Sequence, residues 1–106
     1  ISGGVNIYPQ EIEDELALHP EVYDVAVIGV PDDDLGETVA AFVIPAPGSV
    51  ADVELERRIL GHLGTRLARY KMPRRVEFVD ELPRTPTGKL AKAGLIARYR
   101  TPAQKA

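Results

Sequence analysis

Residues 22–44, VYDVAVIGVPDDDLGETVAAFVI, decide the fold of this chain. Two runs rich in β-branched residues, 22–30 and 38–44, flank the cluster PDDDLG at 31–36. β-Branched side chains favour strands, whereas proline, aspartate and glycine favour turns. The stretch therefore predicts two adjacent strands joined by a turn.

Two amphipathic helices are predicted before and after these strands. Residues 9–20, PQEIEDELALHP, begin with a proline, space Ile12 and Leu16 four positions apart and crowd acidic side chains into the first turns. Residues 52–70, DVELERRILGHLGTRLARY, repeat Leu or Ile at four-residue steps, and Asp52 can cap the start. Each glycine inside this helix costs about 1 kcal/mol relative to alanine, so tertiary packing must hold it.

The remaining segments complete an α+β domain. Residues 2–9, SGGVNIYP, alternate Val and Ile after two glycines, which predicts a short hairpin arm. Residues 75–82, RVEFVDEL, predict a third strand, and residues 91–100, AKAGLIARYR, a final helix. We therefore expect one small compact α+β domain over residues 1–106, with an N-terminal hairpin arm and a three-stranded sheet packed with helices.

The composition is that of an ordinary folded domain. Hydrophobic residues make up 44% and charged residues 27%, which argues against disorder. The absence of cysteine excludes disulfides, thiolate zinc sites and a cysteine nucleophile. No apolar run approaches the roughly 20 residues of a membrane helix, and the N-terminus has no signal pattern. We therefore expect no membrane span and a cytoplasmic location.

The formal net charge of −3 conceals an asymmetry between two halves. Residues 1–56 carry 13 acids and no Lys or Arg, whereas residues 57–106 carry 13 bases and 3 acids. Such a split predicts one of two arrangements. Either a basic surface meets an anion, such as a nucleotide, nucleic acid or phosphate-bearing cofactor, or the two halves pair with each other across one fold.

Residues 82–92, LPRTPTGKLAK, set Lys89 in a loop. The breakers Pro83, Pro86 and Gly88 exclude a helix or inner strand and predict an exposed, partly rigid segment. The stretch is not a phosphate-binding P-loop, because proline stands in place of its first glycine and leucine in place of its metal-binding hydroxyl. A lysine here is either a mobile charge for an anion that changes during a reaction or an ordinary surface lysine.

Two further segments are candidate ligand sites. Residues 66–75, RLARYKMPRR, combine bases with Tyr70, which could stack a nucleobase; the alternative is a solvated helix face with the tyrosine packed inward. The paired glycines of residues 2–4, SGG, permit close approach of a ligand or simply form a tight turn. His19 and His62 lie far apart with no ligand-like spacing, so no metal site is expected.

The order of these motifs resembles that of one family. ISGGVNIYPQEIEDEL, HPEVYDVAVIGVPDDDLGETVAAFV and YKMPRRVEFVDELPRTPTGKLAK are similar to the C-terminal domain of adenylate-forming enzymes, close to acyl- or aryl-CoA synthetases, over nearly all of residues 1–100. The resemblance implies that residues 1–106 are the mobile C-terminal domain of such a synthetase, whose large ATP- and acid-binding N-terminal domain is absent. Alone, such a domain is expected to be inactive.

The resemblance implies a reaction in two steps. A carboxylic acid attacks the α-phosphate of ATP to give an acyl-adenylate and pyrophosphate, and the thiol of coenzyme A then displaces AMP. The small domain takes one orientation for each step. In the first, the resemblance makes Lys89 the catalytic residue, carried with Thr87 and Gly88 on the lysine loop, while the large domain binds most of ATP and Mg²⁺.

In the second orientation, the resemblance brings the glycine-rich segment to the tunnel for the pantetheine arm of coenzyme A. Gly3 and Gly4 then line the tunnel, where a side chain would obstruct it. Tyr70 and Lys71 are implied to lie near the adenine and phosphates of coenzyme A. Met72 departs from the pattern, because a relative places a basic residue there.

The implied partners are the chain's own N-terminal domain, a carboxylic acid, ATP and coenzyme A. The P-x-x-x-x-G-K pattern from Pro83 to Lys89 also resembles the one that lysine acetyltransferases modify, which adds such an enzyme as a partner. One alternative is the end of a peptide-synthetase adenylation domain that loads a carrier protein, although PRTPTGKL differs from its usual NGK-type ending. Another is a small basic-faced nucleic-acid-binding module, which the acidic remainder of the chain disfavours, so no nucleic acid is expected.

Overall fold

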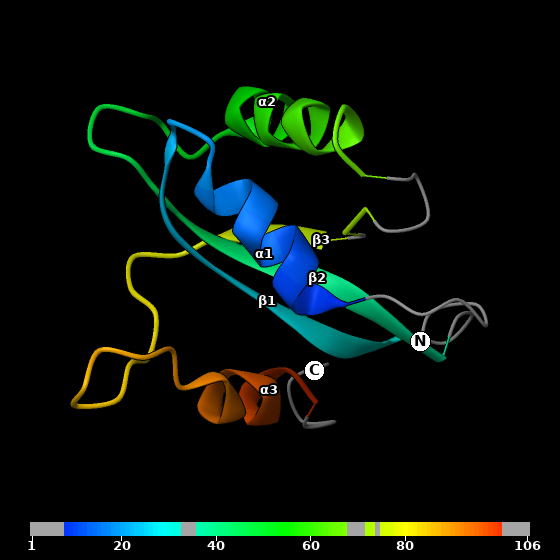
Figure 1. The fold of residues 1–106 in the computed structure, drawn as a ribbon, viewed down its shortest axis with the longest axis vertical. Coiled ribbons are helices and arrows are strands. Elements are labelled where there is room, and N and C mark those ends of the chain that lie inside the picture. Colours follow the sequence, from blue (N-terminus) through cyan, green and yellow to red (C-terminus); the bar gives the residue numbers. More distant parts are fainter. Residues whose placement is uncertain (1–7, 33–35, 68–71, 74, 101–106) are drawn as a thin grey trace.

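The computed structural model of the chain describes residues 8–32, 36–67, 72–73 and 75–100 (Figure 1). Helices and strands follow one another in an order close to the predicted one. The elements are α1 (Pro9–Ala17), β1 (Val22–Asp32), β2 (Gly36–Pro45), α2 (Val53–Gly64), β3 (Arg75–Phe78) and α3 (Lys92–Arg100). The α+β class and the three-stranded sheet are confirmed, while the predicted hairpin arm lies outside the described residues.

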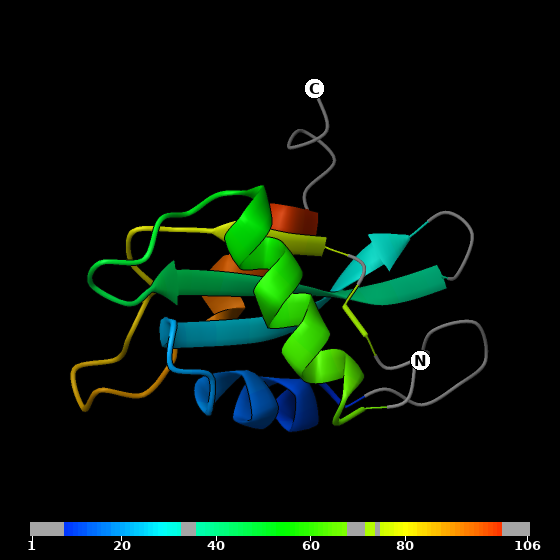
Figure 2. The same cartoon turned by 90° about the horizontal axis from the view of Figure 1, so that it is seen from above.

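The sheet is mixed, with strand order β1-β2-β3 (Figure 2). β1 and β2 are antiparallel from Val22↔Pro45 to Asp32↔Gly36, with a register shift between Val22 and Asp24. β2 and β3 are parallel, and their ladder runs from Ala40↔Arg75 to Val43↔Phe78. A parallel pair needs a crossover between its strands, and α2 lies within that connection.

Helices cover both faces of the sheet, α1 and α2 on one face and α3 on the other (Figure 1). Successive side chains of a strand point to opposite faces, so β1 and β2 contribute to two cores. Strands buried on both faces read as continuous apolar runs, which is why VAVIGV and VAAFVI do not alternate with polar residues. The α1/α2-side core contains Ile12, Leu16, Val22, Val25, Val27, Val39, Ala41, Val43, Leu55, Ile59 and Leu63. The α3-side core contains Ala26, Ile28, Val30, Ala40, Phe42, Leu82 and Leu95.

Two predicted boundaries were wrong. The helix expected to continue to residue 70 ends at Gly64, a poor helix former, and Thr65 closes it by donating from its hydroxyl to the His62 carbonyl at 2.8 Å. The third strand was expected to continue to Leu82 but ends at Phe78. The Val79 N–H still donates to the Val43 carbonyl at 2.9 Å, but the next bond of the ladder would need an N–H at Pro45, which has none. The predicted cap at Asp52 is confirmed by the Leu55 N–H, which donates to its carboxylate at 2.9 Å.

The two oppositely charged halves pair with each other. Arg58 bonds Glu21 at 2.7 Å, Lys92 bonds Glu13 at 2.8 Å, and Arg84 bonds Asp24. Each pair joins a base from residues 57–106 to an acid from residues 1–56. Of the two arrangements predicted from the charge split, the structure supports pairing across the fold for these residues. None of the described helices is both long and apolar enough to cross a membrane.

Candidate functional site

The lysine loop, residues 82–91, contains a tight turn from Thr85 to Gly88. The Gly88 N–H donates to the Thr85 carbonyl at 2.9 Å. Pro86 and Gly88 occupy the second and fourth turn positions, where proline and glycine are favoured. Gly88 has a φ of +91°, which glycine adopts without the steric cost that a side chain adds. The breakers seen in the sequence therefore build a defined turn.

The backbone of Lys89 is held by the same turn. Its N–H donates to the Thr85 hydroxyl at 3.1 Å, and its carbonyl accepts from the Thr85 N–H at 2.7 Å. The Thr85 hydroxyl also contacts the Thr87 hydroxyl at 3.0 Å. Both backbone polar groups of Lys89 are thus satisfied inside the loop, which leaves its side chain free to point outward.

The ends of the loop are anchored in the domain. Leu82 is buried, and Leu90 packs against the same α3-side core. The two arms of the loop are also bonded to each other. Arg84 and Leu90 form an antiparallel bridge, and the Ala91 N–H donates to the Pro83 carbonyl at 2.9 Å. The loop is therefore a short hairpin with its two arms tied together and its base seated on the sheet.

A side-chain contact also ties the loop to β1. The Arg84 guanidinium donates to the Gly88 carbonyl at 2.7 Å and to the Asp24 carboxylate. Reasoning from the sequence missed this contact, because the two residues are 60 positions apart and neither one carries a local signal of the other.

The Lys89 side chain is exposed. None of the ion pairs among the described residues includes its ammonium. A lysine ammonium is a compact charge at the end of a flexible four-carbon stem. The hairpin therefore presents a positive charge that is available to an anion, on a backbone fixed to the sheet.

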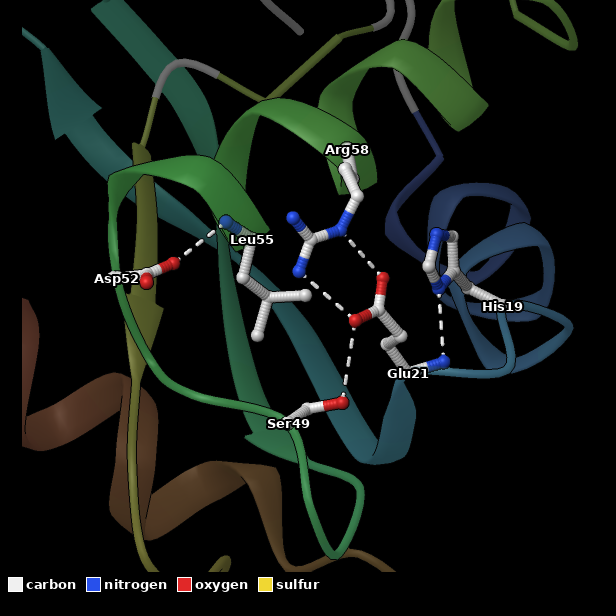
Figure 3. Close-up of polar contacts among 6 residues, drawn as sticks. All are labelled: His19, Glu21, Ser49, Asp52, Leu55 and Arg58. Carbon is white, nitrogen blue, oxygen red and sulfur yellow. Dashed lines mark hydrogen bonds and ion pairs between the residues drawn. The ribbon is translucent and has the colours of Figure 1, made fainter.

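A second polar cluster joins Glu21, the residue before β1, to α2 (Figure 3). Arg58 makes two hydrogen bonds to the Glu21 carboxylate, at 2.7 and 2.9 Å, and the Ser49 hydroxyl adds a third at 3.3 Å. The hydrogen bond from Arg58 lowers the pKa of Glu21 below its usual value, against a smaller opposing effect of desolvation. Arg58 and Ser49 both hold the Glu21 carboxylate, which indicates a structural role.

The two histidines that the sequence separates lie together in the fold. Their rings meet edge to face with centroids 5.2 Å apart. His19 Nδ1 accepts from the Glu21 N–H at 3.0 Å, and His62 Nε2 lies 3.1 Å from the Glu15 carbonyl. Burial, and then the neighbouring His62, lower the pKa of His19 below 6.5. Among the described residues no group of three or more His, Asp or Glu side chains could hold a metal ion.

The structure brings Thr87, Gly88 and Lys89 together on one turn. The other predicted site residues, Gly3, Gly4, Tyr70 and Lys71, lie outside the described residues. Met72, where the sequence departs from the family pattern, is partly buried against the α1/α2-side core. The described part of the site is therefore the lysine loop and the contacts that hold it.

Comparison with known proteins assigns this architecture. The family model for the AMP-binding enzyme C-terminal domain matches residues 11–89. The chain is 48% identical over 99 residues to the long-chain-fatty-acid–CoA ligase FadD13 of Mycobacterium tuberculosis and 50% identical over 99 residues to a feruloyl-CoA synthase of Amycolatopsis sp.. Each match covers 93% of this chain, and 19% and 20% of the respective relatives.

A solved structure agrees in fold. ATP-bound MatB from Rhodopseudomonas palustris superposes with a TM-score of 0.83 at 44% identity, over 94% of this chain and 19% of that one. The chain thus spans about a fifth of the length of the proteins it matches. The comparisons give no support to the nucleic-acid-binding alternative.

Proposed function

The chain belongs to the family of AMP-binding enzyme C-terminal domains, and from this membership we propose that it is the mobile C-terminal domain of an ATP-dependent acyl-CoA synthetase. The complete enzyme converts a carboxylic acid and ATP into an acyl-adenylate and pyrophosphate, and coenzyme A then displaces AMP. The large N-terminal domain supplies the ATP and acid sites. This chain alone has no activity, because those sites belong to the other domain.

One observation carries the proposal: Lys89 presents an exposed ammonium on a fixed hairpin within the residues that the family model matches. In the adenylation step this charge orients the substrate carboxylate and offsets negative charge at the transferring phosphoryl. These are positioning and electrostatic effects, which need a well-placed cation and no proton transfer. Thr87 and Gly88 contribute the turn that places it. In this proposal the large domain holds Mg²⁺, since no group of three or more His, Asp or Glu side chains among the described residues could hold a metal ion.

The thioester step uses a different part of the chain. Gly3 and Gly4 line the tunnel for the pantetheine arm, and Tyr70 and Lys71 meet the nucleotide end of coenzyme A. In this step the domain has rotated and Lys89 has left the active site. A lysine needed in one orientation only should therefore affect only one of the two half-reactions.

Separate assays of the two half-reactions test the proposal in the full-length enzyme. Lys89→Ala is expected to slow pyrophosphate release ~10²–10³-fold, the usual effect of losing one such contact. The thioester step from supplied acyl-adenylate should stay largely intact. Gly4→Leu should show the reverse pattern, because a branched side chain fills the tunnel. Equal damage by Lys89→Ala to both steps would refute the two-orientation assignment.

A matched control comes from the opposite face of the sheet. Arg57 on α2 is 71% exposed and contacts only Glu54 among the described ion pairs, at 3.3 Å. Arg57→Ala removes one positive charge, as Lys89→Ala does, but leaves the lysine loop untouched. It should leave both half-reactions unchanged, so that a loss in the lysine variant reports its position and not the net charge.

We also propose that a lysine acetyltransferase modifies Lys89. The side chain is exposed and makes no ion pair with the described residues, so acetylation would remove its charge without breaking a structural contact. Adenylation would stop while the fold remains. Incubation of the full-length enzyme with such an acetyltransferase and acetyl-CoA, followed by mass spectrometry, tests this, and modification that spares Lys89 would contradict it.

A further inference from the structure

We propose that Arg84, itself oriented by Asp24, is a positioning residue that fixes the direction from which Lys89 enters the active site. The inference rests on the proposed role of Lys89 in adenylation. Its basis is a chain of contacts from the backbone of β1 to the peptide unit that precedes Lys89.

The chain of contacts begins in the sheet. The Asp24 carboxylate accepts from the Val25 N–H at 2.9 Å through one oxygen and binds the Arg84 guanidinium through the other. Asp24 lies at the register shift of β1, next to a strand segment whose side chains are buried from Val25 to Ile28. The carboxylate is therefore held by both of its oxygens, beside a buried segment of the sheet.

The chain of contacts ends at the peptide unit between Gly88 and Lys89. The Arg84 guanidinium donates to the Gly88 carbonyl of that unit at 2.7 Å, and the Lys89 N–H of the same unit donates to the Thr85 hydroxyl at 3.1 Å. A peptide unit is planar, so hydrogen bonds to both its oxygen and its N–H restrict the rotation of that plane. The plane in turn limits the direction in which the Lys89 side chain leaves the backbone.

The loop needs this contact because its other attachments lie at its base. Leu82 and Leu90 seat the two arms on the α3-side core, and the bonds of Thr85 are internal to the hairpin. Two attachments at the base leave the hairpin able to tilt about the line between them. The guanidinium adds a third attachment farther along the hairpin, near the turn, which removes that freedom.

The expected effect is larger on catalysis than on stability. The Arg84 and Asp24 side chains are 40% and 21% exposed, and ion pairs with this much solvent contact contribute little to folding. By contrast, a displacement of about 1 Å at a reacting group can cost ~10²-fold in rate. Arg84→Ala is therefore expected to slow adenylation by ~10–100-fold with a denaturation midpoint close to that of the unmodified enzyme.

Two companion variants separate positioning from a direct effect of charge. Asp24→Asn keeps the arginine charge but weakens the attachment of the guanidinium, so it should also slow adenylation. Arg84→Lys keeps a charge but lacks the planar fork that serves two acceptors at once, so it should not restore the rate. If Asp24→Asn is as active as the unmodified enzyme, or if Arg84→Lys restores the rate fully, the positioning role is refuted.

The experiment combines a catalytic and a physical measurement on the full-length enzyme. Single-turnover adenylation and the thioester step from supplied acyl-adenylate are measured for Arg84→Ala, Arg84→Lys and Asp24→Asn, with Arg57→Ala as control. Cleavage by endoproteinase Lys-C after Lys89 is followed by mass spectrometry, because proteolysis reports local opening of the loop. Slower adenylation and an unchanged thioester step are expected for all three variants. Faster cleavage after Lys89 is expected for Arg84→Ala and Asp24→Asn, whereas Arg84→Lys is left out of the cleavage assay because it adds a Lys-C site to the loop.

The two proposals fail in different ways. If Lys89→Ala slows adenylation but Arg84→Ala does not, the positioning role is refuted while the proposed function stands. If Lys89→Ala leaves adenylation unchanged, the proposed function fails. In that case faster Lys-C cleavage in Arg84→Ala and Asp24→Asn would still support the contact as the one that holds the loop, and unchanged cleavage would overturn it.

Discussion

Lys92→Met is expected to destabilise the domain by about 2 kcal/mol, because it leaves the carboxylate of Glu13 without its cation. Glu13 extends from α1 and Lys92 from α3, on opposite faces of the sheet, and they meet at 2.8 Å beside β1. The same carboxylate oxygen accepts from the Val27 N–H at 2.8 Å. In the described sheet β1 has a strand neighbour only in β2, so this contact satisfies an edge N–H that no strand pairs with.

The magnitude follows from the burial of the two side chains. Breaking a fully buried ion pair by removing one partner costs about 3–5 kcal/mol. Here the Glu13 side chain is 11% exposed and that of Lys92 is 27% exposed, so water can partly replace the missing ammonium. The remaining cost of about 2 kcal/mol corresponds to a fall of about 8–16 °C in the melting temperature of a domain of this size.

A double-mutant cycle in urea and thermal denaturation of the 106-residue chain tests the reasoning. Glu13→Gln keeps an acceptor for the Val27 N–H but removes the buried charge. In that background Lys92→Met should cost much less than it does alone, because no carboxylate is left uncompensated. An equal cost of Lys92→Met in both backgrounds would show that the ammonium stabilises the fold by some other contact.

Three further predictions concern local contacts. The pKa of His19 is lowered in the folded chain, so the unfolded chain binds a proton more readily than the folded chain does. The stability that a neutral His19 gives the fold is therefore complete above about pH 6.5 and is lost as the pH falls from there through the lowered pKa. Urea midpoints measured between pH 7.5 and 5.5 should fall, and His19→Asn should flatten the fall. Asp52→Ala should cost about 1 kcal/mol in the same assay, because the Leu55 N–H loses its cap, and an unchanged midpoint would contradict this. Gly88→Ala should lower the stability by about 1–2 kcal/mol, because residue 88 has a φ of +91°, and it should speed Lys-C cleavage after Lys89. Gly61→Ala is the control: residue 61 has the helical backbone of α2, so alanine there should not be destabilising.

Local patterns in the sequence were sufficient for most of the elements. The β-branched runs correspond to β1 and β2, and the proline and acidic residues before Ile12 correspond to α1. Where local signals conflicted, the prediction failed. The four-residue apolar repeat continues past Gly64, but the helix does not, because Gly64 is a poor helix former; Leu67 still packs against the α1/α2-side core from beyond the end of the helix. Pairing between β2 and β3, which are separated by α2, had no local signal at all.

The candidate site divides in the same way. The sequence identified Lys89 and the breakers around it, because a turn depends on the backbone preferences of a few neighbouring residues. It could not identify Asp24 as the residue that holds Arg84, or Glu13 as a buried acid, which it counted only among the charges that favour the start of a helix.

The sequence by itself determined the class of the fold, the places of its helices and strands, and the lysine loop with its family resemblance. All of these depend on residues close together in the chain, whose side-chain periodicity and backbone preferences act locally. Only the tertiary structure decided that the two charged halves pair, that His19 and His62 meet, and that the lysine loop is attached to β1. These contacts join residues 37 to 79 positions apart. They exist because the sheet brings the ends of distant segments together while its two cores are buried, and no local pattern carries that information.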